Sequence, residues 1–268
     1  MVTIYQQKKP QELCDFIRDG RIKQLTDVFM GGLRRSGFSP KAAKAAAIRA
    51  GFLNQPGDGL REAFAYTACP ACHECVPVRV RLGDFKAGDT ISKKLRRPDN
   101  AAVDFRVLTP RQSLQYSQDL FDLHQDYMSR RFPHSHDPNA KHYDFQRRLM
   151  EASRIFMAIG GGNRLEAAGI AEEQDTHMAL DNVFYDLDAD PKRSLGSCIN
   201  TRIALWAQAE GKDYLYLGYW TAHPGPLHYK VDTFKTLEGY DGQAWKDVRA
   251  NRGMAGPAAD AMRARLVP

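Results

Sequence analysis

Residues 155–171 read IFMAIGGGNRLEAAGIA, two short apolar runs joined by a glycine-rich turn. This pattern is typical of a β-hairpin, because Gly and Asn adopt the backbone conformations that a tight turn requires. MALDNVFY (178–185) predicts a third strand, residues 194–208 predict a helix with one apolar face, and YLYLGY (214–219) predicts a dense apolar strand. Antiparallel strands followed by strand–helix–strand predict an α+β domain with a mixed sheet.

Two interpretations exist for the glycine-rich turn at residues 160–163. A phosphate-binding loop needs a Lys-Ser/Thr pair or GxGxxG spacing, with a helix directly after it. The residues from Leu165 onward instead continue as an apolar strand. We therefore predict a hairpin turn at this position.

The first half of the chain carries different patterns. Apolar residues at three- to four-residue spacing predict helices, alternation of Val with other residues predicts a half-buried strand, and turn-forming residues predict loops. On these grounds we expect helices at 10–30, at 39–51 and within 110–150, a strand at 76–82, and loops at 54–59 and 130–139.

The 268 residues include 38 Lys and Arg against 32 Asp and Glu, a formal net charge of +6. A positive excess favours anionic partners, nucleic acid first, although a basic but merely solvated surface is the alternative. No apolar run approaches the ~20 residues that span a bilayer. The N-terminus lacks the apolar core of a secretion signal, and five cysteines suit reduced thiols better than a disulfide scaffold. We expect a cytoplasmic protein.

The sharpest local motif is CPACHEC (69–75), in which successive cysteines are separated by two residues. Thiolates at this spacing can converge on one zinc ion or iron–sulfur cluster, because a tight turn brings the sulfurs to one side. The spacing favours a metal site with the ligands Cys69, Cys72 and Cys75. A fourth ligand would come from Cys14, His73 or Cys198, or the position would stay open. Buried structural thiols and redox-sensing thiols are the alternatives.

Residues 193–197 lie where a short loop leads into the predicted helix at 194–208. Backbone N–H groups at a helix N-terminus beside an arginine bind anions, whereas simple capping by Ser194 needs no ligand, and the spacing favours neither. The run SKKLRR (92–97) is either a solvated basic face or a contact for a phosphate backbone. His134 and His136 lack a partner motif, so we assign them to a loop.

Several of these segments, in this order, resemble the aminoacyl-tRNA–protein transferases, the arginyl and leucyl transferases of the N-degron pathway, in their short bacterial form. Each segment is weak by itself, but six in sequence span roughly residues 30 to 240. They are GLRRSG (32–37), Tyr66 through the cysteines to CVPVRV (75–80), SKKLRR (92–97), YMSRR (127–131), FYDLD (184–188) leading into RSLG (193–196), and YLYLGYW (214–220).

The resemblance implies a C-terminal domain similar to the GCN5-related acetyltransferase fold, preceded by a smaller N-terminal α/β domain that carries the cysteines. We place these domains at residues 106–250 and 1–105, with a tail at 251–268. The resemblance also implies an enzyme that transfers an arginyl or leucyl group from aminoacyl-tRNA, its co-substrate, to the α-amino group of an acceptor protein or peptide. Relatives prefer an acidic N-terminal residue on the acceptor, and in some eukaryotic relatives the cysteine region holds an iron–sulfur cluster.

An aminoacyl ester is already activated, so the protein must bind the tRNA 3′ end, present a neutral amine and stabilise the oxyanion. The residues that we expect to line the aminoacyl pocket, orient the amine or remove its proton are Tyr185, Asp188, Tyr219 and His223. Those expected to bind the terminal phosphate or ribose are Arg193, Ser194, Leu195 and Gly196. Those expected to recognise the acceptor, through charge-assisted hydrogen bonds, are Arg79, Arg130, Tyr229 and Lys230. Those expected to contact the acceptor stem, without reading its sequence, are Lys93, Lys94, Arg96 and Arg97.

The chain departs from the family pattern at three places: an insertion at roughly residues 38–62, a lone Cys14 in place of Cys-x-x-Leu, and the loop TAHPGPLH (221–228) before Tyr229 and Lys230. The rebuilt loop bears on the acceptor or the transferred amino acid, and an alternative within the same class is a transferase that acts on a small molecule or a biosynthetic peptide. Two rival classes of protein share some of these features: an acyl-CoA-dependent N-acetyltransferase, and a non-catalytic, metal-stabilised RNA-binding module.

Overall fold

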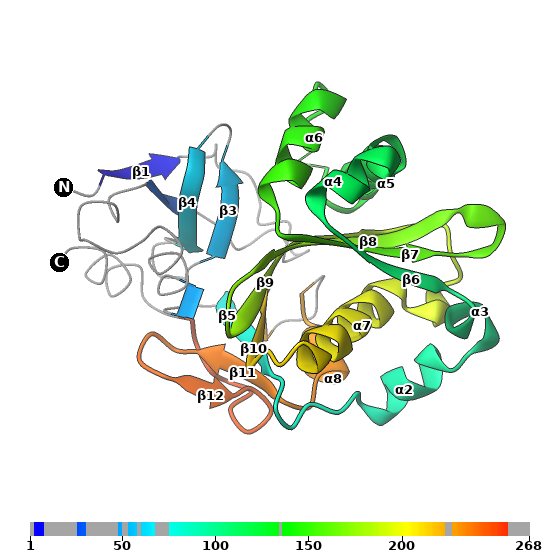
Figure 1. Ribbon diagram of the computed structural model, residues 1–268. Coiled ribbons are helices and arrows are strands. Elements are labelled where there is room, and N and C mark those ends of the chain that lie inside the picture. The colour runs from blue at the N-terminus through cyan, green and yellow to red at the C-terminus, as the bar shows by residue number, and fades with distance from the viewer. Residues whose placement is uncertain are drawn as a thin grey trace. The chain divides into compact units, whose positions relative to one another are not determined.

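In the computed structural model, the chain divides into two compact units, which are described separately (Figure 1). The terminal unit comprises residues 1–81, 216–232 and 236–268, and the central unit comprises residues 82–215 and 233–235. The structure describes residues 3–7, 26–30, 48–49, 53–57, 60–67, 75–133, 136–222 and 227–256. The domain boundaries near residues 105 and 250 stay predictions.

The central unit contains four neighbouring antiparallel strands in the order β9-β8-β7-β6. They are β6 (Asp104–Leu108), β7 (Arg154–Ile159), β8 (Leu165–Glu173) and β9 (His177–Tyr185). The hairpin predicted between β7 and β8 is confirmed, with a short 3-10 turn, η3 (Gly161–Asn163), between them. Gly162 and Asn163 adopt φ angles of 67° and 60° there, which explains the residue types at this turn.

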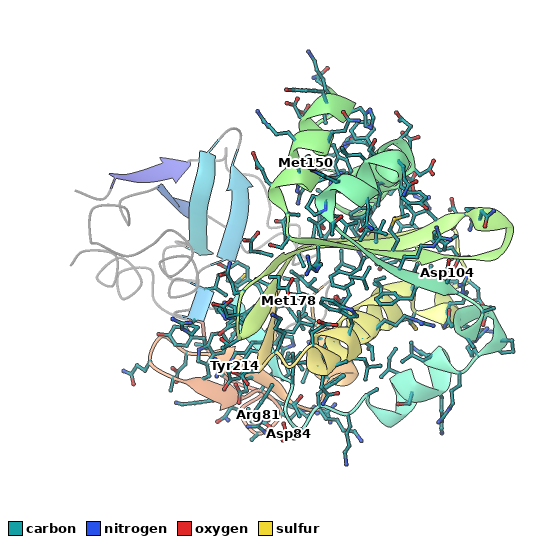
Figure 2. The ribbon with its side chains drawn as sticks, in the orientation of Figure 1. Arg81, Asp84, Asp104, Met150, Met178 and Tyr214 are labelled. Atoms are coloured by element: carbon teal, nitrogen blue, oxygen red, sulfur yellow. The ribbon has the colours of Figure 1, made fainter. Side chains whose placement is uncertain are left out.

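Helices cover both faces of this part of the sheet (Figure 1). On one face lie α4 (Pro110–Ser113), the 3-10 turn η2 (Leu114–Tyr116), α5 (Ser117–Arg131) and α6 (His142–Glu151). On the other face lie α2 (Asp89–Leu95), α3 (Pro98–Ala101) and α7 (Leu195–Ala209), which is preceded by the 3-10 turn η4 (Pro191–Arg193). Both α5 and α7 pack on β8 and β9, and the side chains in Figure 2 fill these layers.

Helix α7 forms because its apolar residues recur on one face, as the sequence predicted. Leu195, Ile199 and Ile203 are buried against the sheet, and the ring of Trp206 packs edge-on against Phe156 with their centroids 5.2 Å apart. The helix approaches β8 so closely that a Cβ atom at Gly169 would lie 2.8 Å from Cδ1 of Ile203. The position of α7, and of the loop that leads into it, is therefore fixed by packing.

The terminal unit contains two groups of strands. One consists of β5 (Val76–Arg81), β11 (Leu237–Tyr240) and β12 (Trp245–Asp247), all antiparallel. The other has the order β1-β2-β4-β3 and comprises β1 (Thr3–Gln7), β2 (Thr26–Met30), β3 (Leu53–Gly57) and β4 (Leu60–Thr67). Strand β10 (Tyr214–Trp220) and the short helix α8 (Lys230–Thr233) each continue from one unit into the other along the chain.

The α+β class predicted from the sequence is confirmed, but two local predictions were wrong. Strand β2 occupies the end of the helix expected at 10–30, because pairing with β1 and β4 overrides the helical spacing of Val28 and Phe29. Strand β3 occupies most of the loop expected at 54–59, because its residues pair with β4 despite their turn-forming types. Of the helix expected at 39–51, the structure describes Ile48 and Arg49, which are helical.

No helix among the described residues is both long enough and apolar enough to cross a bilayer. The helices α5 and α7 have 15 residues each, short of the ~20 that a membrane span needs.

A histidine on the buried face of α5 lies in the core. His124 is 8% exposed, its ring packs against Phe145 and Phe184 with centroids 5.2 and 5.1 Å away, and its Nε2 lies 3.1 Å from Asn182 Nδ2. Burial, reinforced by the charge of Arg148, lowers the pKa of His124 from 6.5 to about 3.

This burial predicts a loss of stability in acid. Because the imidazole binds its proton more readily in the unfolded chain, stability is retained above pH 6.5 and is lost as the pH falls toward 3. The loss attributable to this group is on the order of 5 kcal/mol. Urea unfolding at a series of pH values should show a clearly weaker acid dependence for His124→Gln than for the wild type. His142→Gln is the control, and equal pH dependence in wild type and His124→Gln would refute the prediction.

Candidate functional site

The candidate site lies where the loop after β9 enters α7. Ser194 occupies the N-cap position in the left-handed conformation (φ 52°, ψ 51°), and its side chain does not cap the helix. Its hydroxyl instead lies 2.6 Å from the Lys94 ammonium, which donates to it from α2. The N–H groups of the first helical turn have no acceptor within the helix, and the helix dipole adds partial positive charge there. Ser194 thus leaves these N–H groups uncapped by its side chain, and the Lys94 ammonium lies beside the first turn of the helix, which we call the α7 turn.

Arg193 is turned into the protein. Its guanidinium donates to both carboxylate oxygens of Glu166 at 3.0 and 2.5 Å, to Asn100 Oδ1 at 3.0 Å and to the Asp99 carbonyl at 3.1 Å. Arg193, Glu166 and Asn100 are 9%, 6% and 2% exposed. A contact of Arg193 with tRNA stays a prediction, and the observed contacts give this residue a positioning role.

The backbone at Arg193 is held as firmly as the side chain. Its carbonyl accepts from Asn100 Nδ2 at 3.0 Å and from Cys198 Sγ at 3.3 Å. The same Asn100 amide donates to the Lys94 carbonyl at 2.9 Å. Asn100 therefore joins the end of α2 to the residue that precedes Ser194, so the cation and the helix turn are positioned by one buried network.

Glu166 and Asn100 were missed by the sequence reasoning. The signal for Glu166 was present, because it is a single carboxylate inside the apolar run LEAAGIA of β8, and such a group must be paired when it is buried. A Cβ atom at Gly160 would lie 2.2 Å from Cδ of Glu166, so the glycine leaves room for the carboxylate. Asn100 gives no comparable signal, since it lies in a polar segment.

Tyr185 and Asp188 lie at the end of β9. A Cβ atom at Gly196 would lie 2.6 Å from Cε1 of Tyr185, so this ring lies directly against the first turn of α7, and it packs on Tyr127 with centroids 5.0 Å apart. Asp188 is exposed and accepts two hydrogen bonds from Arg130 at 3.0 and 2.7 Å. These bonds lower the pKa of Asp188 below its usual value. The structure therefore brings the Tyr185 ring next to the α7 turn, while Asp188 is paired with Arg130.

The remaining basic residues of the segment 92–97 differ in their contacts. Arg97 donates to Asp99 at 3.3 Å and pairs with Asp190 at 3.4 Å. Lys93 and Arg96 are exposed. The predicted basic segment thus lies beside the α7 turn, with part of its charge already neutralised by carboxylates.

The predicted site residues in the terminal unit are held by internal contacts. Arg79 donates to Glu238 at 2.8 Å and lies over the Trp245 ring at 4.3 Å. Lys230 is buried, and its ammonium donates to the carbonyls of Leu217, at 2.8 Å, and Tyr219. Burial lowers the pKa of Lys230 to about 7.

Two more of the predicted site residues, Tyr219 and Tyr229, belong to the terminal unit. Tyr219 is buried and Tyr229 is half-buried. His134 and His223 lie outside the described residues.

Among the cysteines of the predicted metal motif, Cys75 is buried, while Cys69 and Cys72 lie outside the described residues. The described parts of the chain contain no group of three or more His, Cys, Asp or Glu side chains that could hold a metal ion. Cys198 is buried beneath the α7 turn, and this burial raises the pKa of its thiol.

Solved structures show partial likenesses. The structure of L-PGS from Bacillus licheniformis has a TM-score of 0.44 at 13% identity, covering 56% of this chain and 46% of that one. The GCN5-related glucosamine N-acetyltransferase region of a fungal multi-domain β-N-acetylglucosaminidase has a TM-score of 0.42 at 13% identity, covering 62% of this chain and 20% of that one.

Sequence comparison gives closer relationships. Residues 119–241 match the family model for "Arginine-tRNA-protein transferase, C terminus". An aspartate/glutamate leucyltransferase of Paramagnetospirillum magneticum is 30% identical over 204 residues, which cover 72% of this chain and 78% of the relative. A protein of the same name from Acinetobacter baumannii is 28% identical over 195 residues, which cover 70% of this chain and 66% of the relative. The chain therefore spans about two thirds of that protein. The resemblance identified from the motifs is confirmed: the chain belongs to the aminoacyl-tRNA–protein transferases, a family of tRNA-dependent aminoacyltransferases.

Proposed function

We propose that this protein transfers an aminoacyl group from aminoacyl-tRNA to the α-amino group of an acceptor protein or peptide. The neutral amine attacks the ester carbonyl, the new C–N bond forms, the C–O bond to the tRNA 3′ end breaks, and the proton lost by the amine balances the one gained by the departing 3′ oxygen. No external reductant, oxidant or activating nucleotide is needed, because the ester is already activated.

The observation that carries the proposal is the turn at Ser194. The ammonium of Lys94 stands at 2.6 Å from the Ser194 hydroxyl, beside the N-terminal amides of α7. A cation and oriented N–H groups together bind a phosphate or stabilise developing negative charge. We assign this turn to the 3′-terminal nucleotide of the tRNA, with Arg193 as the residue that positions the turn from within the protein.

Tyr185 and Asp188 are proposed to orient the reacting groups. The Tyr185 ring packs on Gly196 and Tyr127 and forms a rigid wall beside the α7 turn. Because its bonds from Arg130 lower the pKa of Asp188, this carboxylate stays charged at neutral pH and is a poor proton acceptor. It therefore suits electrostatic orientation of an amine better than removal of its proton.

For the transferred group and the acceptor, we propose leucyl or arginyl, and peptides with an acidic first residue. The relatives described above are named aspartate/glutamate leucyltransferases, and the matching family model is named for arginine. Leucyl-tRNA with Asp- or Glu-initiated peptides is the combination to test first.

The direct test incubates the protein with tRNA charged with leucine, arginine or phenylalanine, and with peptides that differ in their first residue. Mass spectrometry should find leucine or arginine added at the N-terminus of the Asp and Glu peptides. Uncharged tRNA is the negative control. Acetyl-CoA as the sole donor tests for an acetyltransferase, and acetylated peptide without any aminoacylated product would overturn the proposal.

A separate proposal concerns the cysteines, with Cys69, Cys72 and Cys75 as ligands of zinc or an iron–sulfur cluster. Burial of Cys75, which is 4% exposed, is compatible with a ligand that is withdrawn from solvent. We expect metal in stoichiometric amount in protein purified anaerobically, and a large loss of metal in Cys72→Ser. Equal, substoichiometric metal in both proteins would rule the site out.

A further inference from the structure

Three exposed cations belong to the two segments that meet at the α7 turn. Lys93 and Arg96 come from the end of α2, and Lys192 comes from η4; all three are exposed. Two contacts hold these segments together: Lys94 donates to Ser194 at 2.6 Å, and Arg97 pairs with Asp190 at 3.4 Å. We call Lys93, Arg96 and Lys192 the α2–η4 basic surface.

The contacts divide the cations of this region into two classes. Arg97 is bound to Asp99 and Asp190, and Arg193 is bound to Glu166. The three members of the α2–η4 basic surface pair with no carboxylate among the described residues. Their charge is therefore available to a partner, while that of Arg97 and Arg193 is largely neutralised within the protein.

The chemistry of this surface favours RNA over a membrane. A peripheral membrane surface combines cations with exposed large apolar side chains. In the described part of the chain, the exposed large apolar residues are Leu114, Tyr143, Met150 and Leu205; the first three lie on η2 and α6, the opposite face of the sheet, and the fourth near the end of α7 (Figure 1). A basic surface without apolar anchors suits a hydrated phosphate backbone.

We propose that the α2–η4 basic surface holds the phosphate backbone of the tRNA acceptor arm next to its 3′ end, with Lys192 as a contact alongside Lys93 and Arg96. This inference rests on the proposed function, because it needs tRNA as a substrate. It also revises the assignment for Arg97, whose carboxylate partners remove it from this role. The contacts are to phosphates, so they set affinity and its salt dependence without selecting a sequence.

The test compares the wild type with a Lys93→Ala/Arg96→Ala/Lys192→Ala variant in binding to uncharged tRNA between roughly 50 and 200 mM salt. Each phosphate contact adds ~0.7–0.9 to the slope of log affinity against log salt, so the triple variant should have a slope lower by roughly 2–3. Over that fourfold salt range, the wild type should lose roughly 20- to 40-fold more affinity than the variant. Arg97→Ala alone should leave the slope nearly unchanged.

The matched control is Arg111→Ala/Lys141→Ala/Arg147→Ala. It makes the same change in net charge on the α4–α6 face and should keep the wild-type slope. Thermal unfolding should be similar in the two triple variants, because the side chains altered in them are exposed. An unchanged slope in the first triple variant, with tight wild-type binding, would overturn this inference alone.

Two further outcomes have different consequences. Failure of the wild type to bind tRNA at all would overturn the proposed function together with this inference. The second outcome is that the wild type binds phosphatidylglycerol vesicles and the first triple variant does not, while the two proteins have the same salt slope for tRNA. This outcome would identify a membrane surface and overturn the RNA assignment.

Discussion

A Glu166→Gln variant is expected to unfold with a free energy about 3–5 kcal/mol lower than that of the wild type. The Glu166 carboxylate is 6% exposed and accepts two hydrogen bonds from the Arg193 guanidinium, which is also buried. Gln keeps the shape of the side chain but removes the charge, so the buried cation keeps only the more distant and partly exposed Asp99 carboxylate, 3.7 Å away, as a counterion. Urea unfolding at neutral pH measures the change.

A double variant separates the charge effect from general damage. Glu166→Met combined with Arg193→Met removes both charges, and we expect it to be clearly more stable than either single Met variant, because no unpaired charge remains buried. If the double variant is instead as unstable as the sum of the single ones, the pair contributes no coupling and the prediction is wrong.

Gly160→Ala tests the same pair without changing a charge. The backbone at Gly160 is extended (φ −89°, ψ −164°), so alanine is compatible with its conformation. Its Cβ would lie 2.2 Å from Cδ and Oε1 of Glu166, however, so the carboxylate must shift from the position in which it accepts both hydrogen bonds from Arg193. We expect partial loss of stability for this reason, whereas Gly161→Ala, where a Cβ meets no atom within 4 Å, is the control.

The second large effect is expected for Lys94→Met, which should lower kcat/KM for aminoacyl-tRNA by roughly 10- to 100-fold, the usual cost of losing a charge-assisted hydrogen bond. The Lys94 ammonium donates a hydrogen bond to the Ser194 hydroxyl and therefore lies at the α7 turn. Methionine keeps the apolar stem of the side chain, so packing at the end of α2 is preserved. Steady-state transfer to an Asp-initiated peptide, with tRNA limiting, measures the change.

The neighbouring residue supplies the control for this variant. Lys93→Met removes one charge from the same helix, and the proposed role of Lys93 is a salt-dependent contact with the tRNA backbone. Its effect should therefore be several-fold smaller than that of Lys94→Met and should disappear at high salt. Lys94→Arg should recover part of the activity, because a cation is restored near the turn. Equal effects of Lys93→Met and Lys94→Met would mean that the position of the charge beside Ser194 is irrelevant.

Only part of the candidate site could be predicted from the sequence. The segment 193–196 and the basic run at 92–97 were recognised from motifs, and the structure brings Lys94 and Ser194 within hydrogen-bond distance. The orientation of Arg193 was not predictable in this way, because an arginine beside a helix N-terminus can face solvent or the core. Its inward direction depends on Glu166, 27 residues earlier, and Asn100, 93 residues earlier.

By itself, the sequence determined the hairpin of β7 and β8, the helix α7 with its apolar face, and the family, because each of these depends on local spacing or on motifs in a fixed order. Tertiary structure alone decided that residues 26–30 and 53–57 are strands, since pairing with β4 supplied hydrogen bonds that local propensity does not describe. It also decided which cations are already paired and which face solvent. The sequence gives only the number of cationic side chains. Whether each of them can bind a partner depends on carboxylates that folding brings from distant segments.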